Sequence, residues 1–205
     1  MRSLLFSIAL LGTACASEYK GLRPVKVDER CLTSIRPPAL TTAWYDAGID
    51  VVGKHISGLL LIKEMPDFSR RVVFTNEAGV TFFDFGYDPA GKFKVHYVIR
   101  QLDKKAVIRL LRNDFALLLG IPFQSRVWKS WEMNGEKYFG VGEKKQNHFL
   151  ITREDCGSLL RLETASKRKK MLTIAFSGSD VQRPESITLQ HHTFAMQINL
   201  KKLIR

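Results

Sequence analysis

The sequence lacks the features that mark a membrane span, a metal centre or a common catalytic site. No segment reaches the roughly 18 uninterrupted apolar residues that a transmembrane helix needs. Only three cysteines are present, and neither a CxxC nor a Cys/His cluster has metal spacing. GxSxG, HExxH, P-loop and dinucleotide-binding patterns are also missing. We therefore expect no metal, no cofactor and no enzymatic activity.

Acidic residues are scarce beside basic ones. The 20 Asp and Glu residues face 32 Lys and Arg residues, which gives a formal net charge of +12. In a cytosolic protein this excess would point to nucleic acid, because clustered bases neutralise phosphates. In an exported protein it points to anionic lipid head groups or other envelope polyanions. The compartment therefore has to be read from the N-terminus.

The first 16 residues have the pattern of an export signal. A short basic start containing Arg2 precedes an apolar stretch, residues 4–11, that is too short to span a bilayer, and small residues follow it. Two processing routes fit. Cleavage before Cys15 would make this cysteine the lipidated first residue, although Gly12 stands where a lipobox usually has a large aliphatic residue. Cleavage after Ala16 would instead release a soluble periplasmic protein.

The lipidated route divides the chain into a signal peptide over residues 1–14, a lipidated N-terminus and tether over 15–39, and one domain over 40–205. Cys31 and Cys156 could form a disulfide in an oxidising compartment or remain two separate buried thiols. His191 and His192 are strand or bulge residues rather than a chelating pair, because neighbours on a strand point to opposite faces.

The domain reads mainly as β-strands. Residues 44–63 form one β-rich segment with bends at glycines, and residues 185–200 form one long strand. That long strand changes phase, which predicts a bend or bulge near His191 and His192. The clearest alternation places Phe93, Val95 and Tyr97 on one face of a half-buried antiparallel strand. We expect one curved, mostly antiparallel sheet of about nine to eleven strands.

One substantial helix is predicted over residues 104–119, with Asp103 as N-cap and Gly120 just past its end. Further apolar residues widen its apolar stripe, so it must be buried on more than one side. It could lie in the mouth of the curved sheet or be an ordinary core helix. The stripe consists of Val107, Leu110, Leu111, Phe115 and Leu118.

A basic run lies at a predicted hairpin tip and consists of Lys167, Arg168, Lys169 and Lys170. It is either a solvated turn or a contact with anionic head groups or an acidic partner. We do not expect nucleic acid as a partner, because the aromatic residues mostly alternate inward instead of interleaving with bases. The 13 Phe and 3 Trp residues exceed what a thin core needs. With the apolar helix they predict a concave hydrophobic cavity suited to acyl chains, which gain about 0.8 kcal/mol per CH₂ on leaving water.

Two segments, VGKHISGLLLIKEMPDFSRRVVFTNEAGVTFFDF and PESITLQHHTFAMQINLKKL, resemble the early hairpins and closing strands of the LolA/LolB lipoprotein-sorting proteins. The resemblance implies a mainly β (α+β) fold, namely an unclosed antiparallel β-barrel with an apolar helical lid or plug over an acyl-binding cavity. The helix stripe together with Phe93, Val95 and Tyr97 would line that cavity.

A LolB-like chain would be an outer-membrane lipoprotein facing the periplasm. It would bind acyl chains or lipoproteins and receive them from a periplasmic carrier protein. LolB also carries an apolar residue on an exposed turn, where this chain has Glu77 and Ala78. Phe68, in the preceding turn, is therefore the candidate for membrane contact together with the basic run. The alternative is a non-transporting envelope lipoprotein that docks a partner complex or cell-wall polymer through its basic surface.

Overall fold

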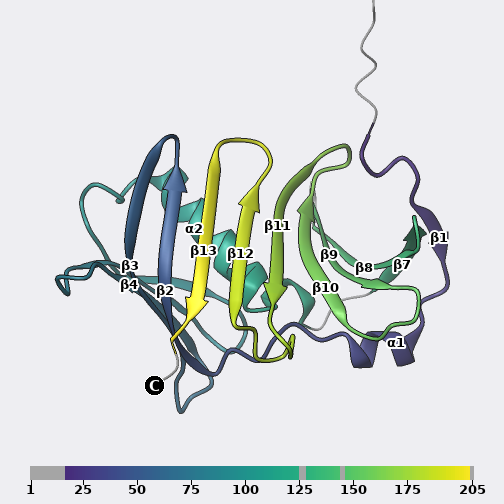
Figure 1. Cartoon of the computed structure of the whole chain (residues 1–205), viewed down its shortest axis with the longest axis horizontal. Coiled ribbons are helices and arrows are strands. Elements are labelled where there is room, and N and C mark those ends of the chain that lie inside the picture. The colour runs from purple at the N-terminus through teal and green to yellow at the C-terminus, as the bar shows by residue number, and fades with distance from the viewer. Residues whose placement is uncertain (1–16, 125–127, 144–145, 204–205) are drawn as a thin grey trace, which may run out of the picture.

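In the computed structural model, which describes residues 17–124, 128–143 and 146–203, the chain forms one antiparallel sheet around a central helix (Figure 1). The helices are α1 (Glu29–Ser34), α2 (Lys105–Leu118) and the short 3₁₀ helix η1 (Ile121–Phe123). The strands are β1 (Arg23–Val25), β2 (Thr42–Val51), β3 (Lys54–Glu64), β4 (Arg70–Thr75), β5 (Thr81–Tyr87), β6 (Phe93–Val98), β7 (Lys129–Met133), β8 (Glu136–Glu143), β9 (Gln146–Arg153), β10 (Leu159–Ala165), β11 (Lys170–Ser177), β12 (Ser186–His191) and β13 (Met196–Lys202).

The sheet has 13 strands in the order β1-β7-β8-β9-β10-β11-β12-β13-β2-β3-β4-β5-β6. It ends at β1 and β6, so it is curved but unclosed, as the sequence predicts. The strand β13 pairs with β2 and joins the two ends of the chain into one continuous sheet. Among the described residues, no helix is long and apolar enough to cross a membrane.

The expected count of nine to eleven strands is wrong because two predicted segments are hairpins and the lead-in contributes β1. Residues 44–63 form β2 and β3, which are joined at Val52 and Gly53, both with positive φ (47° and 76°). Residues 185–200 form β12 and β13, so the phase change near His191 and His192 marks a hairpin turn rather than a bulge. A short turn and a bulge shift the phase of an alternating pattern in the same way, so the sequence did not separate them.

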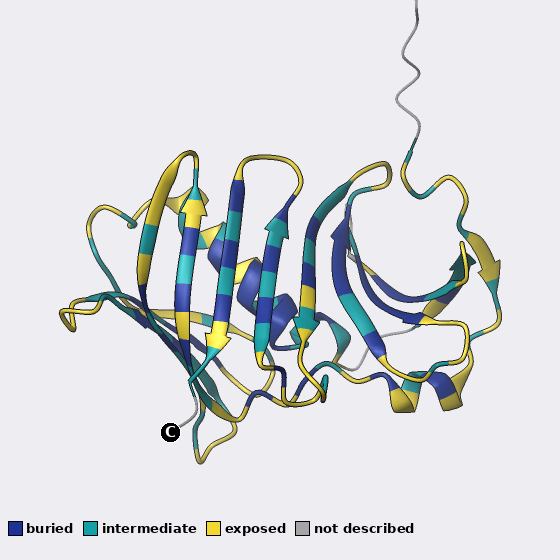
Figure 2. Ribbon diagram, viewed as in Figure 1, coloured by how far each residue is buried: buried dark blue, intermediate teal, exposed yellow. Residues whose placement is uncertain are grey.

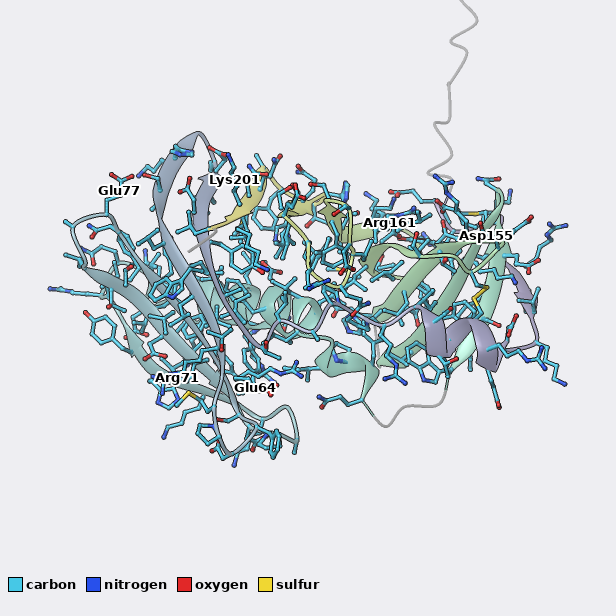
Figure 3. All side chains as sticks on the ribbon, turned by 60° about the horizontal axis from the view of Figure 1, so that its bottom comes forward. Glu64, Arg71, Glu77, Asp155, Arg161 and Lys201 are labelled. Carbon is cyan, nitrogen blue, oxygen red and sulfur yellow. A yellow bond between two sulfur atoms is a disulfide. The ribbon has the colours of Figure 1, made fainter. Side chains whose placement is uncertain are left out.

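The lead-in before residue 40 is not the irregular tether that its prolines suggest. β1 pairs with β7 at one border of the sheet, where Pro24 is tolerated because the outer side of an edge strand needs no N–H. α1 begins after Asp28, whose carboxylate accepts a hydrogen bond from the Cys31 amide at 3.1 Å. Cys31 is bonded to Cys156 with a Cα–Cα distance of 5.2 Å, and this disulfide lies beside α1 in Figure 3. It ties α1 to the turn between β9 and β10.

The alternation predicted for β6 is interrupted. Val95 lies opposite Phe85 while Tyr97 lies opposite Asp84, so His96 is an extra residue between them. From that point the strand reverses its faces, and Tyr97 lies on the outer face of the sheet instead of the inner one.

The long helix is close to the prediction. Its N-cap is Lys104, without a side-chain cap, and not Asp103. Gly120 follows its end in the left-handed conformation (φ 70°), which a glycine adopts without strain. The helix lies against the hollow face of the sheet, and its C-terminal half is buried (Figure 2).

Candidate lipid-binding interior

The sheet face that meets α2 is lined by buried apolar side chains from β11 to β5. Aromatic rings pack in series near its β6 border: Phe83 stacks on Phe85 at 4.5 Å and meets Phe115 of α2 at 5.7 Å. The strands that contribute run from β11 through β13 to β5. The buried residues on this wall include Leu60, Ile62, Val72, Phe74, Phe83, Phe85, Ile174, Ile187, Leu189, Ile198 and Leu200.

The helix stripe is the other wall of this interior. Phe115 and Leu118 are fully buried and Leu111 is 5% exposed. Val107 and Leu110, nearer the start of α2, are half-buried and pack against the same core. The side chains of α2 therefore fill the interior of the curved sheet.

Three polar contacts hold α2 in place. The Tyr87 hydroxyl donates to the Arg112 carbonyl at 2.7 Å, and the Arg70 guanidinium donates to the Leu119 carbonyl at 2.6 Å. The third contact is internal: Asp114 Oδ2 lies 2.9 Å from His191 Nε2 at the end of β12. The first reaches a carbonyl in the middle of the helix, the second satisfies the carbonyl of the C-cap residue Leu119, and the third crosses the core.

The Asp114–His191 pair is the only one of these contacts that is buried on both sides, with side-chain exposures of 3% and 4%. Burial raises the pKa of Asp114, and the hydrogen bond from His191 opposes that shift. Sequence reasoning missed the pair. The available signal was an acid in the most apolar half of a helix, which is rare unless it has a partner.

A pocket of about 320 Å³ opens beside the exposed side of α2. Its lining includes Arg112 and Asn113 of α2, Tyr87 of β5, and His148 of β9. A polar pocket next to an apolar interior can accept the head of an amphipathic molecule whose tail lies inside.

The three β6 residues expected in the cavity are divided by the bulge. Phe93 is half-buried and packs on Phe85 at 5.2 Å, with the Arg112 guanidinium 5.5 Å from its ring centre. Val95 and Tyr97 are 36% and 49% exposed. Of the three, Phe93 is the one that closes the interior.

The residues expected at the membrane do not lie together. Phe68, 71% exposed, lies in the turn between β3 and β4, whereas Lys167, Arg168 and Lys169 are exposed in the turn between β10 and β11. Alternate turns of an antiparallel sheet lie at opposite ends of its strands, and these two turns are at opposite ends. Lys170 is half-buried, with its Nζ 3.1 Å from Glu163. Cys15 lies outside the described residues.

A second buried polar cluster lies on the outer face of β8 to β10. The carboxylate of Glu163, fully buried, accepts hydrogen bonds from the Tyr19 hydroxyl and the Arg161 guanidinium, both at 2.7 Å. Arg161 also binds both oxygens of Glu136 at 2.7 Å (Figure 3 labels Arg161). Burial raises the pKa of Tyr19, and the neighbouring Glu163 raises it further. The hydrogen bond from Tyr19 thereby holds the segment that begins at Ser17 against the sheet.

No family model matches the chain. A search of the curated proteins also finds no match. Among solved structures, the fold is similar to a DUF1329 family protein from Desulfovibrio piger, at 10% identity over 85% of this chain and 88% of that chain, with a TM-score of 0.43. A candidate outer membrane lipoprotein-sorting protein domain from Vibrio parahaemolyticus is similar at 8% identity over 86% and 88% of the two chains, with a TM-score of 0.42. At these values the likeness carries no functional argument, and function has to be drawn from the contacts of the chain itself.

Proposed function

We propose that the protein is a cell-envelope lipoprotein that holds acyl chains, free or attached to a lipoprotein, between its sheet and α2. The observation that carries the proposal is the continuous apolar wall opposite a helix held by three polar contacts. The function is binding without catalysis. Cys15 would carry the anchor that keeps the protein at the outer membrane, facing the periplasm.

The energetics support a plug that cargo displaces. Releasing the buried side chains of Leu111, Phe115, Leu117 and Leu118 costs about 6–12 kcal/mol, at about 1.5–3 kcal/mol each. An acyl chain of about 15 methylenes that takes their place gains about 12 kcal/mol at about 0.8 kcal/mol per CH₂. The two quantities are of the same size, so a long chain offsets the displacement of α2 and a short one does not.

Uptake of a fluorescent fatty acid by the purified protein tests this proposal. We expect saturable binding that strengthens with chain length. Replacing the fully buried Ala47 on the inner wall with Leu narrows the interior and should weaken binding. Ala175→Leu, on the exposed outer face of β11, is the matched control and should leave binding unchanged. A folded protein that takes up no fatty acid of any length would contradict the proposal.

The location has its own test. The intact mass of the protein in the membrane fraction should include a diacylglyceryl group, and Cys15→Ala should remove that mass. A mass that corresponds to cleavage after Ala16 would instead make the protein a free periplasmic carrier.

A second function is favoured by the complete burial of Phe115, Leu117 and Leu118. If α2 never leaves the sheet, the protein is a non-transporting envelope lipoprotein that docks a cell-wall polymer or a partner complex through its basic surface. This function predicts that the protein sediments with purified peptidoglycan and takes up no fatty acid.

A further inference from the structure

Three neighbouring turns and the start of the described chain lie together at one end of the strands, at the top of Figure 1. We call it the anchor edge and define it as residues 52–53, 166–169 and 192–195. Backbone hydrogen bonds join its parts in series. The Glu18 amide donates to the Arg168 carbonyl at 3.1 Å, that of His192 to Met171 at 3.0 Å, and that of Val52 to Ala195 at 2.9 Å.

Two apolar side chains are exposed at this edge. Val52 is 74% exposed, and Phe194, whose ring packs on His191 at 4.7 Å, is 38% exposed. Val52 also has a φ of 47°, in the left-handed region that β-branched residues rarely adopt, and the following Gly53 has a φ of 76°. Two positive φ values in a two-residue hairpin turn favour Asn-Gly or Asp-Gly, not Val. An exposed, strained, apolar residue at such a position costs stability, and strain of this kind is characteristic of functional sites.

The middle turn is basic. Lys167, Arg168 and Lys169 are exposed there, whereas Lys170 pairs with the buried Glu163. Bases beside apolar tips are the combination that binds an anionic membrane surface, where each base contributes electrostatically and apolar side chains enter the interface.

The N-terminal segment reaches the fold at this same turn. Besides the Glu18 contact, the Ser17 hydroxyl donates to the Lys167 carbonyl at 3.4 Å. Cys15 is two residues before Ser17, and two residues of chain span at most about 7 Å. A lipid attached at Cys15 would therefore hold the anchor edge against the bilayer.

We infer that the anchor edge docks on anionic phospholipid bilayers, with Lys167, Arg168 and Lys169 on the head groups and Val52 and Phe194 in the interface. This surface goes beyond the proposed acyl-binding interior and does not depend on it. The full chain carrying Cys15→Ala, which no lipid can anchor at that position, should still sediment with vesicles of phosphatidylcholine and phosphatidylglycerol. It should bind phosphatidylcholine alone weakly, and salt should weaken the anionic binding.

Two variants test the contacts. Replacing the three exposed bases with Gln should lower the affinity about fivefold per base, since each is worth about 1 kcal/mol near an anionic surface. Val52→Asn should weaken binding while raising the unfolding temperature, because Asn suits the left-handed turn better. A loss of binding through misfolding would lower that temperature.

Phe68→Asn is the matched control. Phe68 is also exposed (71%) and left-handed (φ 62°), but it lies at the opposite edge of the sheet, so its replacement should leave vesicle binding unchanged. The inference is overturned if Phe68→Asn abolishes binding, if Val52→Asn does not alter it, or if the protein binds peptidoglycan and not vesicles. Fatty-acid uptake should be the same in all these variants, so failure of the docking surface and failure of the acyl-binding interior can be told apart.

Discussion

Removing the acid that α2 places in the core should loosen the helix. We consider Asp114→Leu, which leaves His191 buried at 4% side-chain exposure without its carboxylate partner. The substitution keeps the branching and the number of side-chain heavy atoms, so it leaves no cavity, but its methyl groups are larger than the carboxylate oxygens. The double variant described next separates the effect of the orphaned imidazole from this difference in size.

The expected magnitude follows from the burial of both partners. Removing one partner of a buried hydrogen bond costs about 1–3 kcal/mol, because the remaining polar group is desolvated without compensation. Replacing both residues, as Asp114→Leu with His191→Leu, should recover most of that loss, since an apolar pair of similar volume needs no partner. The interaction energy from this double-mutant cycle should be large and favourable.

Urea unfolding of the wild type, Asp114→Leu, His191→Leu and the double variant measures these free energies of unfolding. The chain supplies a matched control in Asp50 and His55, a pair of the same residue types at 2.6 Å but 54% and 61% exposed. Asp50→Leu should change the free energy of unfolding by about 1 kcal/mol or less, because solvent screens an exposed pair. If α2 moves aside for cargo, Asp114→Leu should also take up fatty acid faster. An Asp114→Leu protein as stable as the wild type, or a double variant no better than the single one, would refute the assignment of the pair as the contact that holds α2.

Other perturbations have equally defined outcomes. Reducing the Cys31–Cys156 disulfide, which spans 125 residues, should lower the free energy of unfolding by about 5 kcal/mol in the loop-entropy model, measured by urea unfolding with and without reductant. Phe115→Ala should destabilise the fully buried centre of α2 by about 3–5 kcal/mol, and a smaller change would mean that the helix is not packed as described. The hydrogen bond from Arg161 lowers the pKa of Glu136, so this acid stabilises the fold above its ordinary pKa of 4.5 and loses that contribution as the pH falls through the lowered value. Glu136→Gln should flatten the decline of the unfolding temperature below that pH, and an unchanged decline would contradict the assignment.

Much of the fold could be predicted from local patterns. The 104–119 helix and Gly120 after it agree with the structure to within a few residues. They do so because hydrophobic periodicity and turn chemistry act over a few neighbouring residues. Local patterns could not predict the β2–β3 and β12–β13 hairpins or the bulge at His96, because a turn and a bulge shift an alternating pattern in the same way.

The sequence by itself determined the class of the protein: an antiparallel sheet, one helix with a wide apolar stripe, and a basic chain with the pattern of an export signal. The tertiary structure decided which distant residues meet. Cys31 with Cys156, and Asp114 with His191, are 125 and 77 residues apart, and only the pairing order of the strands brings them together. It also separated Phe68 from the basic run and placed Val52 and Phe194 beside it. The physical reason is that strand order and direction, which no local pattern encodes, assign each turn to an edge of the sheet.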